Sequence, residues 1–474
     1  MKRKKKKQKN IEIVLVTYLF VFLFISMMGY FVYFVYAKSG EVMNSPYNTR
    51  QELLANKVVR GKILSKDGHI LAETIIEADG KEVRRYPYAQ LFAHAVGYSV
   101  KGKMGLEGNA NFTLLTSNTF VGEQVKNSMN EKKNIGDNVV STLDMELQQI
   151  AYDSLGIYQG AIIAMEPKTG KILAMVSKPD FDPNQIDSQW EELTKSSEDG
   201  VFVNRCTQGL YPPGSTFKMI TALEYIRENP SSYLNEHYLC TGQFIQGGNG
   251  IRCYRGQAHG DVDLTKAFAK SCNSSFAHMG LSLDRVSFLG TLETLFFNQD
   301  LGLPFASNPS QISLNNETTD AQLIQASIGQ GTTLMTPIHM AMITSAVANE
   351  GKMMKPYLMD HVQTYKGSVI KTYSPESMGQ VMDKEEAEAL KKLMAEVVET
   401  GTGTKLKDAL YTSVGKTGSA EYSNKEKGES HAWFTGFAPA QDPQIAVTVI
   451  IEKAGSGGDY AVPVAKRLFD AYLN

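Results

Sequence analysis

The sequence lacks the short motifs that usually hold a metal ion or a nucleotide. It has only four cysteines in 474 residues, no two of which form a Cys-x-x-Cys pair, and its eight histidines show no His-x-x-x-His spacing. Zinc sites commonly use such spacings. The Gly-Thr-Gly-Thr-Lys run at 401–405 lacks the full phosphate-loop spacing. No segment of about 20–50 residues repeats, which excludes a solenoid or a propeller. We therefore expect no metal site.

The chain as a whole also has little net charge. The formal net charge is −2, with 42% hydrophobic and 21% charged residues, as in ordinary folded proteins. Basic residues gather in the first ten positions, seven of which are Lys or Arg, and the remainder is acidic. A nucleic-acid-binding protein would carry positive charge on its folded body. We therefore expect no nucleic-acid partner.

One long apolar run follows this basic tail. Residues 13–36 contain no charged side chain and are long enough to cross a bilayer core of about 30 Å. A cleavable signal peptide would have a shorter apolar core, of about 7–15 residues. The sequence predicts a retained single-pass anchor at 11–36, with the basic tail 1–10 in the cytoplasm and the rest of the chain outside.

The chain after the anchor divides by composition into two parts. Residues 37–142 are polar and broken by Gly and Asn, with a strand–turn–strand pattern at 62–72, and predict a small α+β module. In 143–474 a hairpin pattern at 161–176 precedes a helical middle and a late strand. Helical periodicity is found at 215–227, 264–281, 319–328, 337–349, 384–399 and from Ala461, and the late strand is at 444–452. This order predicts one sheet whose edges come from both ends of the domain, with helices covering it.

Two of the cysteines flank a glycine-rich segment. Cys240 and Cys253 enclose four glycines and could close a disulfide-bonded loop outside the membrane. They could equally be two unpaired thiols, because a sequence does not determine connectivity. Both interpretations stay open.

The strongest chemical signal begins at Ser215. This serine follows Pro212-Pro213-Gly214 and opens an apolar helical pattern, where it could simply cap the helix. Lys218 lies one turn later on the same face, about 5–6 Å away at Cβ. A lysine buried beside a serine would lose part of its charge and could accept the serine proton. The helix N-terminus would favour the resulting alkoxide.

Two further segments strengthen the interpretation of Ser215 and Lys218 as catalytic residues. Ser271-Cys272-Asn273 lies 56 residues after Ser215, and Lys416-Thr417-Gly418 begins 145 residues after Ser271. Alone, each would be a polar turn or an exposed strand. In this order they match the Ser-x-x-Lys, Ser-x-Asn and Lys-Thr-Gly set of the penicillin-reactive serine enzymes.

Across almost all of the chain after the anchor, the sequence resembles the class B penicillin-binding proteins, which are monofunctional peptidoglycan D,D-transpeptidases. The supporting segments are Arg60-Gly61-Lys62-Ile63, Asp67-Gly68, Gly105-Leu106-Glu107, Pro167-Lys168-Thr169-Gly170, Asp182-Pro183-Asn184 and Gly329-Gln330-Gly331. The resemblance implies an α/β (α+β) transpeptidase domain at 143–474 with an antiparallel central sheet flanked by helices. It also implies a short dimerisation-type pedestal at 37–142 and no cofactor. Cys272 departs from the Ser-Asp-Asn form, and we interpret it as a packing residue.

The resemblance also implies a role for each motif residue. Ser215 would attack the carbonyl between two D-alanines of a peptidoglycan stem peptide, with Lys218 as general base. Ser271 would pass a proton to the leaving amine with help from Lys416, and Asn273 would hold a substrate amide.

The remaining roles concern substrate binding. The backbone N–H groups of Ser215 and Ser419 would form the oxyanion hole. Thr417 and Ser419 would bind the terminal carboxylate, and Gly418 would leave room for the substrate. β-Lactams would mimic the donor and stay attached to Ser215.

The expected partners are peptidoglycan stem peptides, β-lactams, a polytopic membrane glycan polymerase and other wall-synthesis proteins of growth or division. Two alternatives remain. A β-lactamase would share the motifs, but the Glu-x-x-Leu-Asn arrangement that serves deacylation in class A enzymes is absent. A non-enzymatic β-lactam sensor or scaffold would keep the fold, but only about ten residues precede the anchor.

Overall fold

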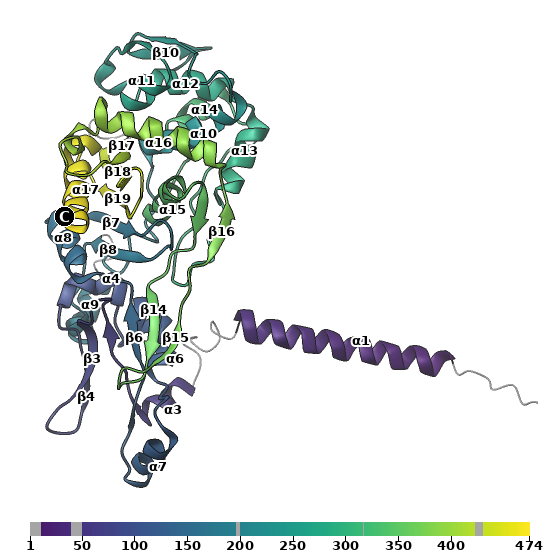
Figure 1. Ribbon diagram of the computed structural model, residues 1–474, viewed down its shortest axis with the longest axis vertical. Coiled ribbons are helices and arrows are strands. Elements are labelled where there is room, and N and C mark those ends of the chain that lie inside the picture. Colours follow the sequence, from purple (N-terminus) through teal and green to yellow (C-terminus); the bar gives the residue numbers. More distant parts are fainter. Residues whose placement is uncertain (1–10, 39–49, 196–199, 316, 422–429) are drawn as a thin grey trace, which may run out of the picture.

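The computed structural model describes residues 11–38, 50–195, 200–315, 317–421 and 430–474. Figure 1 shows a helix that stands apart from the body, a lower region built on one sheet, and an upper region in which helices surround a second sheet.

The helix that stands apart is α1 (Ile11–Tyr33), which continues into the π-helical turn η1 (Phe34–Lys38). The segment Ile11–Tyr36 has a mean hydropathy of 2.4, and none of its most apolar window is buried against the body. At 1.5 Å per residue, α1 alone is about 35 Å long. It is the candidate membrane anchor of the chain.

The lower region is built on a six-stranded sheet with the order β15-β14-β6-β2-β3-β4. Its strands are β2 (Ile63–Leu64), β3 (Ile70–Ile76), β4 (Glu82–Arg85), β6 (Asn138–Ser141), β14 (Met359–Gln363) and β15 (Val369–Thr372). β2 and β3 form the hairpin expected at 62–72. β14 pairs antiparallel with β6, although more than 200 residues separate them. The sheet therefore combines strands from two distant parts of the chain.

A buried carboxylate joins two of the sequence motifs in this region. Glu107 is fully buried and accepts from Arg60 and Arg84 at 2.5–2.6 Å. Burial alone would raise the pKa of Glu107, but the two guanidinium groups hold it below its usual value. The other elements here are α3 (Arg50–Ala55), β1 (Val58–Val59) paired with β5 (Asn134–Ile135), η2 (Ala89–Phe92), α4 (Ala93–Val96), α5 (Gly105–Asn109), α6 (Asn111–Leu114) and α7 (Val121–Met129).

The upper region contains a five-stranded sheet in which all neighbours are antiparallel. Its order is β17 (Val414–Glu421), β18 (Ser430–Ala438), β19 (Ile445–Ile451), β7 (Gly160–Met165) and β8 (Ile172–Lys178). One edge is an early strand and the other a late strand, as the sequence predicted. β18 was not foreseen, because all nine of its residues are buried and show no polar alternation.

Helices cover both faces of this sheet (Figure 1). α8 (Met145–Leu155) and α17 (Gly457–Leu473) pack on one face, and α15 (Pro337–Ala348) packs on the other. Along β7, Ile162 belongs to the core that contains Phe469, whereas Ile163 belongs to the core that contains Met342. Burial on both sides therefore accounts for the continuous apolar run of this strand.

The remaining upper elements form a helical part and its loops. They are η4 (Gly214–Phe217), α10 (Lys218–Glu228), β9 (Tyr238–Cys240), β10 (Gln243–Gln246), β11 (Asn249–Arg252), η5 (Tyr254–Gly256), β12 (Gly260–Val262), α11 (Leu264–Ala269), α12 (Asn273–Ser282), α13 (Arg285–Thr294), α14 (Asp320–Ser327), β13 (Lys352–Met354), β16 (Ser377–Gln380), α16 (Lys384–Glu399) and η6 (Thr404–Leu406). Two further elements, η3 (Pro183–Gln185) and α9 (Ile186–Lys195), instead pack beside η2 and α4 of the lower region (Figure 1). The helices expected at 319–328, 337–349 and 384–399 are α14, α15 and α16.

Three predicted helices differ from those observed. The helix expected from Ser215 begins as the 3₁₀ turn η4 and becomes α-helical only at Lys218. The helix expected at 264–281 is interrupted between α11 and α12. α17 begins at Gly457, before the expected Ala461.

Candidate active site

Ser215 lies in the tight turn η4, which is packed against the edge strand β17. Gly214, just before it, has φ +53°, and its N–H donates to the carbonyl of Gly329 at 2.9 Å. A Cβ on Gly214 would lie 2.9 Å from the carbonyl oxygen of Ser419. The glycine therefore lets the turn approach the strand closely. Ser215 is half-buried and is not a helix cap, since the cap positions of η4 and α10 are Pro213 and Phe217.

Lys218, the first residue of α10, is completely buried. Its amine donates to the Ser271 carbonyl at 2.8 Å and to Asn273 Oδ1 at 2.7 Å, and lies 3.3 Å from Ser271 Oγ. Among the described residues its hydrogen bonds go to this segment rather than to Ser215. Burial lowers the pKa of Lys218 to about 8 and outweighs the opposite effect of two nearby thiols. A substantial neutral fraction is therefore present near physiological pH.

The interruption between α11 and α12 positions Ser271. This residue has φ +56°, and its N–H donates to the carbonyl of Phe268 at 3.2 Å, as at many helix C-termini. Cys272 then caps α12 by accepting the N–H of Ser275 at 3.4 Å. The local turn ends one helix, starts the next, and leaves Ser271 and Asn273 beside Lys218.

Lys416 approaches the same hydroxyl from β17. It is completely buried, and its amine lies 3.0 Å from Ser271 Oγ and 3.0 Å from the Thr417 carbonyl. Burial, followed by the charge of Lys218, lowers the pKa of Lys416 well below its usual value. The Ser271 hydroxyl therefore bridges two buried amines.

The rest of the Lys-Thr-Gly segment runs along the free edge of the sheet. β17 has only β18 as a sheet neighbour, so its outer edge can pair with an extended peptide. The Ser419 hydroxyl accepts the N–H of Gly457 at 3.3 Å. The Thr417 hydroxyl bonds to that of Thr402, which lies in a segment that resembles the family (400–404) but was given no role in the site. Its Gly-Thr-Gly context was the available signal.

Gly418 has a different role from the one expected. We expected its missing side chain to leave room for a substrate. A Cβ on Gly418 would lie 3.0 Å from the Pro213 carbonyl oxygen and 3.1 Å from Thr216 Cγ2. The space is therefore filled by η4, and the glycine permits close packing of the turn on the strand.

All the predicted site residues thus converge where η4, the start of α12 and β17 meet, between the five-stranded sheet and the helices α10–α14 in the upper part of Figure 1. Cys240 and Cys253, the two cysteines considered for a disulfide, are both free in the structure, with their sulfurs 3.7 Å apart.

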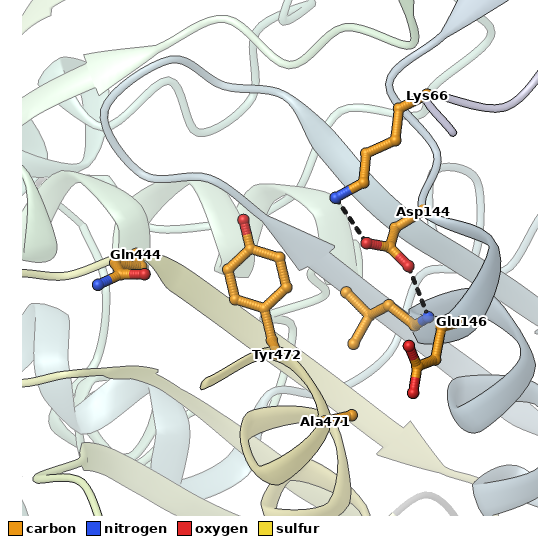
Figure 2. Close-up of a pocket in the computed structure, with 7 residues that line it drawn as sticks. Lys66, Asp144, Glu146, Gln444, Ala471 and Tyr472 are labelled. Atoms are coloured by element: carbon orange, nitrogen blue, oxygen red, sulfur yellow. Dashed lines mark hydrogen bonds and ion pairs between the residues drawn. The ribbon is translucent and has the colours of Figure 1, made fainter. Parts of the chain in front are cut away.

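A separate cavity of about 350 Å³ lies where the lower and upper regions meet (Figure 2). Across it, Lys66 pairs with Asp144 at 2.6 Å, and Asp144 also caps α8 by accepting the Leu147 N–H at 2.8 Å. Burial lowers the pKa of Lys66, but Asp144 more than compensates and raises it overall. The cavity is lined by none of the predicted catalytic residues.

A serine and two buried lysines at the edge of a helix-covered antiparallel sheet define the class of penicillin-reactive serine enzymes. The sequence pattern of the penicillin binding protein transpeptidase domain matches residues 160–470, and that of the penicillin binding protein A dimerisation domain matches residues 60–139. The chain belongs to the penicillin-binding protein transpeptidase family. The predicted family and fold class are confirmed.

Relatives and solved structures agree with this assignment. The chain is 31% identical to peptidoglycan D,D-transpeptidase PbpA of Mycolicibacterium smegmatis, over 93% of this chain and 94% of the relative. It is 28% identical to peptidoglycan D,D-transpeptidase MrdA of Haemophilus influenzae, over 86% of this chain and 68% of the relative. The ceftriaxone acyl-enzyme complex of penicillin-binding protein A from M. tuberculosis superimposes with a TM-score of 0.82, at 26% identity, over 89% of this chain and 100% of that one.

Proposed function

We propose that this chain is a peptidoglycan D,D-transpeptidase that works through an acyl-enzyme on Ser215. The observation that carries the proposal is the Ser271 hydroxyl, which bridges the buried amines of Lys218 and Lys416 beside the Ser215 turn. The names of the PbpA and MrdA relatives and the acyl-enzyme formed by the M. tuberculosis protein support it.

The first half-reaction forms the acyl-enzyme. Ser215 Oγ attacks the carbonyl carbon between two D-alanines while neutral Lys218 takes the hydroxyl proton. The backbone N–H groups of Ser215 and Ser419 hold the oxyanion. The C–N bond then breaks, and the proton passes from Lys218 through Ser271 to the departing D-alanine amine. The Lys218 amine is hydrogen-bonded to three oxygens, the carbonyl and hydroxyl of Ser271 and Oδ1 of Asn273. Of these, only the Ser271 hydroxyl can both accept and donate a proton.

The second half-reaction releases the product. An amine of a neighbouring stem peptide attacks the Ser215 ester, and its proton returns along the same path to Ser215 Oγ. A new amide cross-link forms and the free serine is restored.

The donor peptide lies along the free edge of β17 in this proposal. The hydroxyls of Thr417 and Ser419 bind its terminal carboxylate. The Lys416 amine supports them from the adjacent position, where it donates to the Thr417 carbonyl. Asn273 holds a backbone amide of the donor. Its side chain is already fixed between Lys218 and the carbonyl of Arg252, at 2.7 and 2.9 Å.

The proposal includes the arrangement at the membrane. The tail 1–10 lies in the cytoplasm, 11–36 spans the bilayer, and the pedestal 37–142 and the transpeptidase domain 143–474 lie outside. The described helix at Ile11–Tyr36 supports the anchor. A polytopic glycan polymerase that contacts the anchor and pedestal is the proposed protein partner, because polymerisation must supply the glycan chains whose stem peptides this enzyme cross-links.

Covalent labelling with a fluorescent penicillin tests the proposal on the full chain in detergent. The wild type should give a stable band and Ser215→Ala should give none. Lys218→Ala should be labelled at a rate at least about 100-fold lower than the wild type. Lys266→Ala, an exposed lysine on α11 outside the site, is the matched control and should label normally.

The lifetime of the labelled band separates the alternatives. Persistence for minutes or longer, together with release of D-alanine and dimer formation from a stem peptide and an amine acceptor, supports a transpeptidase. Rapid loss of the label indicates a β-lactamase. A stable label without turnover of any stem peptide indicates a sensor. Labelling of Ser215→Ala would place the nucleophile elsewhere and refute the mechanism.

A further inference from the structure

The helix α7 has its apolar side turned away from the body. Val121, Val125 and Met129 follow one another at helical spacing and are 69%, 48% and 80% exposed, and Phe120, just before the helix, is 81% exposed. A Cβ on Gly122 would lie 2.7 Å from the Phe120 ring, so this ring lies over the same outer side of the helix. A surface helix of a water-soluble protein normally packs its apolar side on the core. In α7 this arrangement is inverted.

Polar side chains on the opposite side of α7 fix this orientation. Glu123 accepts from the Lys366 amine at 2.7 Å and from the hydroxyl of Tyr365, both of which lie between β14 and β15. Asn127 donates to Asn134 Oδ1 at 3.0 Å. Rotation of the helix to bury its apolar side would break these contacts with two separate segments of the body. The outward position of the apolar side is therefore specified by the fold.

α7 lies close to the point at which the chain from the anchor enters the body. The strand after it, β5, pairs with β1, which follows α3, and Lys133 donates to the carbonyl of Ala55, the last residue of α3, at 3.0 Å. Residues 39–49 connect the anchor to α3, and eleven extended residues reach about 40 Å at most. Figure 1 shows α3 and α7 at the lower end of the body, opposite the upper region. The apolar side of α7 is therefore within reach of the membrane that holds the anchor.

The size and charge of this surface suit a lipid bilayer better than a second protein. A stable protein–protein interface buries about 800 Å² and about 20–30 residues on each partner, whereas four side chains form this surface. The helix and the turn after it carry three lysines, Lys126, Lys132 and Lys133, and two glutamates, Glu123 and Glu131. Lysines beside an apolar helix side are typical of helices that lie in a membrane interface, because their ammonium groups reach the phosphates of the headgroups.

We propose that α7 is a second membrane contact of this chain, in which Phe120, Val121, Val125 and Met129 enter the surface of a phospholipid bilayer. Interfacial helices place their apolar side about 5–10 Å deep, at the boundary between headgroups and acyl chains. The contact holds the pedestal against the membrane and limits how far Ser215 can move from it. The inference rests on the proposed membrane arrangement of the anchor and does not depend on the reaction of Ser215.

Tryptophan fluorescence of the full chain tests the proposal in phospholipid nanodiscs that hold one chain each, after subtraction of the wild-type signal. Met129→Trp reports on α7, and Phe22→Trp reports on the anchor. Ile157→Trp is the matched control, because Ile157 is an apolar residue of the upper region and is 98% exposed. With acyl chains brominated near the headgroups, Met129→Trp should lose at least about half of its added emission. Ile157→Trp should lose less than about a tenth, since no apolar helix side surrounds it.

A second set of variants links the quenching to the apolar side of α7. Val121→Asp together with Val125→Asp, introduced into Met129→Trp, should abolish the quenching, because carboxylates resist transfer out of water. Both positions are exposed, so these changes leave the packing of the body intact. Ser215→Ala, introduced into Met129→Trp, should leave the quenching unchanged, which separates this result from any failure of the proposed reaction.

The three tryptophan variants also separate the other occupants of this surface. Quenching of Phe22→Trp without quenching of Met129→Trp would overturn the inference and leave the anchor intact. Absence of quenching in both would refute the proposed anchor as well. A blue shift of Met129→Trp that requires two chains in one nanodisc would place a second copy on α7. A shift that requires an added wall-synthesis protein would place that protein there, and either result would overturn the proposal.

Discussion

Three bases that are completely buried, Lys218, Lys416 and His339, have no carboxylate partner among the described residues. Burial lowers the pKa of each, to about 8 for Lys218 and about 4 for His339. At the two lysines the lowered pKa suits the proton transfer that we propose. At His339 it makes the fold sensitive to acid, because the folded protein resists a proton that the unfolded chain accepts.

His339→Gln should reduce the loss of stability in acid. The His339 Nε2–H donates to the Leu295 carbonyl at 2.6 Å, while buried Nδ1 has no partner within the described part of the chain. The folded pKa of about 4 lies below the ordinary 6.5, so the unfolded state binds the extra proton and stability falls as pH drops from 6.5 towards 4. At pH 5.5 this group costs the wild type about 1 kcal/mol relative to pH 7.

Glutamine can keep the donor to Leu295 and has no proton to gain. Melting temperatures measured between pH 7 and pH 5.5 should therefore fall by about 2 °C less in the variant than in the wild type. Equal falls in the two proteins would show that His339 is not the acid-sensitive group.

Single residues differ in how far the sequence reveals them. Ser215, Lys218, Ser271, Asn273 and Lys416 could be singled out because each motif is contiguous and its spacing matches known chemistry. Cys240, Cys253, His259 and Cys272 lie together in the structure but were not singled out as a group, because they lie on four separate elements with 12, 5 and 12 residues between successive members. A search for short spacings does not detect a cluster that only the tertiary fold assembles.

At the scale of elements, the turn η4 depends on three glycines from separate segments. Gly214 approaches Ser419, Gly418 approaches Pro213, and Gly329 has its missing side chain directly against the turn. A Cβ on Gly329 would lie 2.1 Å from the Gly214 carbonyl oxygen and 2.7 Å from Phe217 Cβ. No rearrangement of a flexible side chain relieves a contact with backbone, so the turn itself would move.

Gly329→Ala should therefore abolish or strongly slow penicillin labelling of Ser215. Gly302→Ala is a matched control, because Gly302 also has a positive φ, +58° against +74° at Gly329, but no other atom near its missing side chain. Both variants carry a backbone strain of about 1–2 kcal/mol, because alanine is placed at a positive φ. Only Gly329→Ala displaces η4, so its labelling rate should fall at least about tenfold below the control. Equal rates in the two variants would mean that the turn tolerates displacement.

The sequence pattern predicted helices and strands that have one buried and one exposed face, but not those that are buried on both faces. α16 carries its apolar residues on one side and begins with a capping box at Asp383 and Glu386, and its bounds follow from the sequence. β18 is buried on both faces and shows no period. The interruption between α11 and α12 has no Pro or Gly to announce it, because Ser271 itself adopts the left-handed conformation.

At the scale of the whole molecule, the lower and upper regions are not independent along the chain. β14 and β15 come from residues 359–372, yet they extend the sheet that contains β2, β3, β4 and β6. The ion pair between Lys66 and Asp144 adds a polar contact at the same junction (Figure 2). Composition suggested a boundary near residue 142, but long-range strand pairing has no local signal that a sequence pattern could reveal.

A fragment of residues 143–474 should consequently be less stable than one of residues 50–474. In the shorter fragment β14 loses β6, and Met359, His361, Val362 and Gln363 lose their antiparallel partners. The exposed strand edge and the uncovered apolar side chains favour aggregation. We expect the shorter fragment to melt about 10 °C or more below the longer one and to elute in part as aggregates in size-exclusion chromatography. Equal melting temperatures and a monomeric profile for both would show that the five-stranded sheet and its helices fold without the pedestal. The pairing of β14 with β6 would then not be needed for the stability of the upper region.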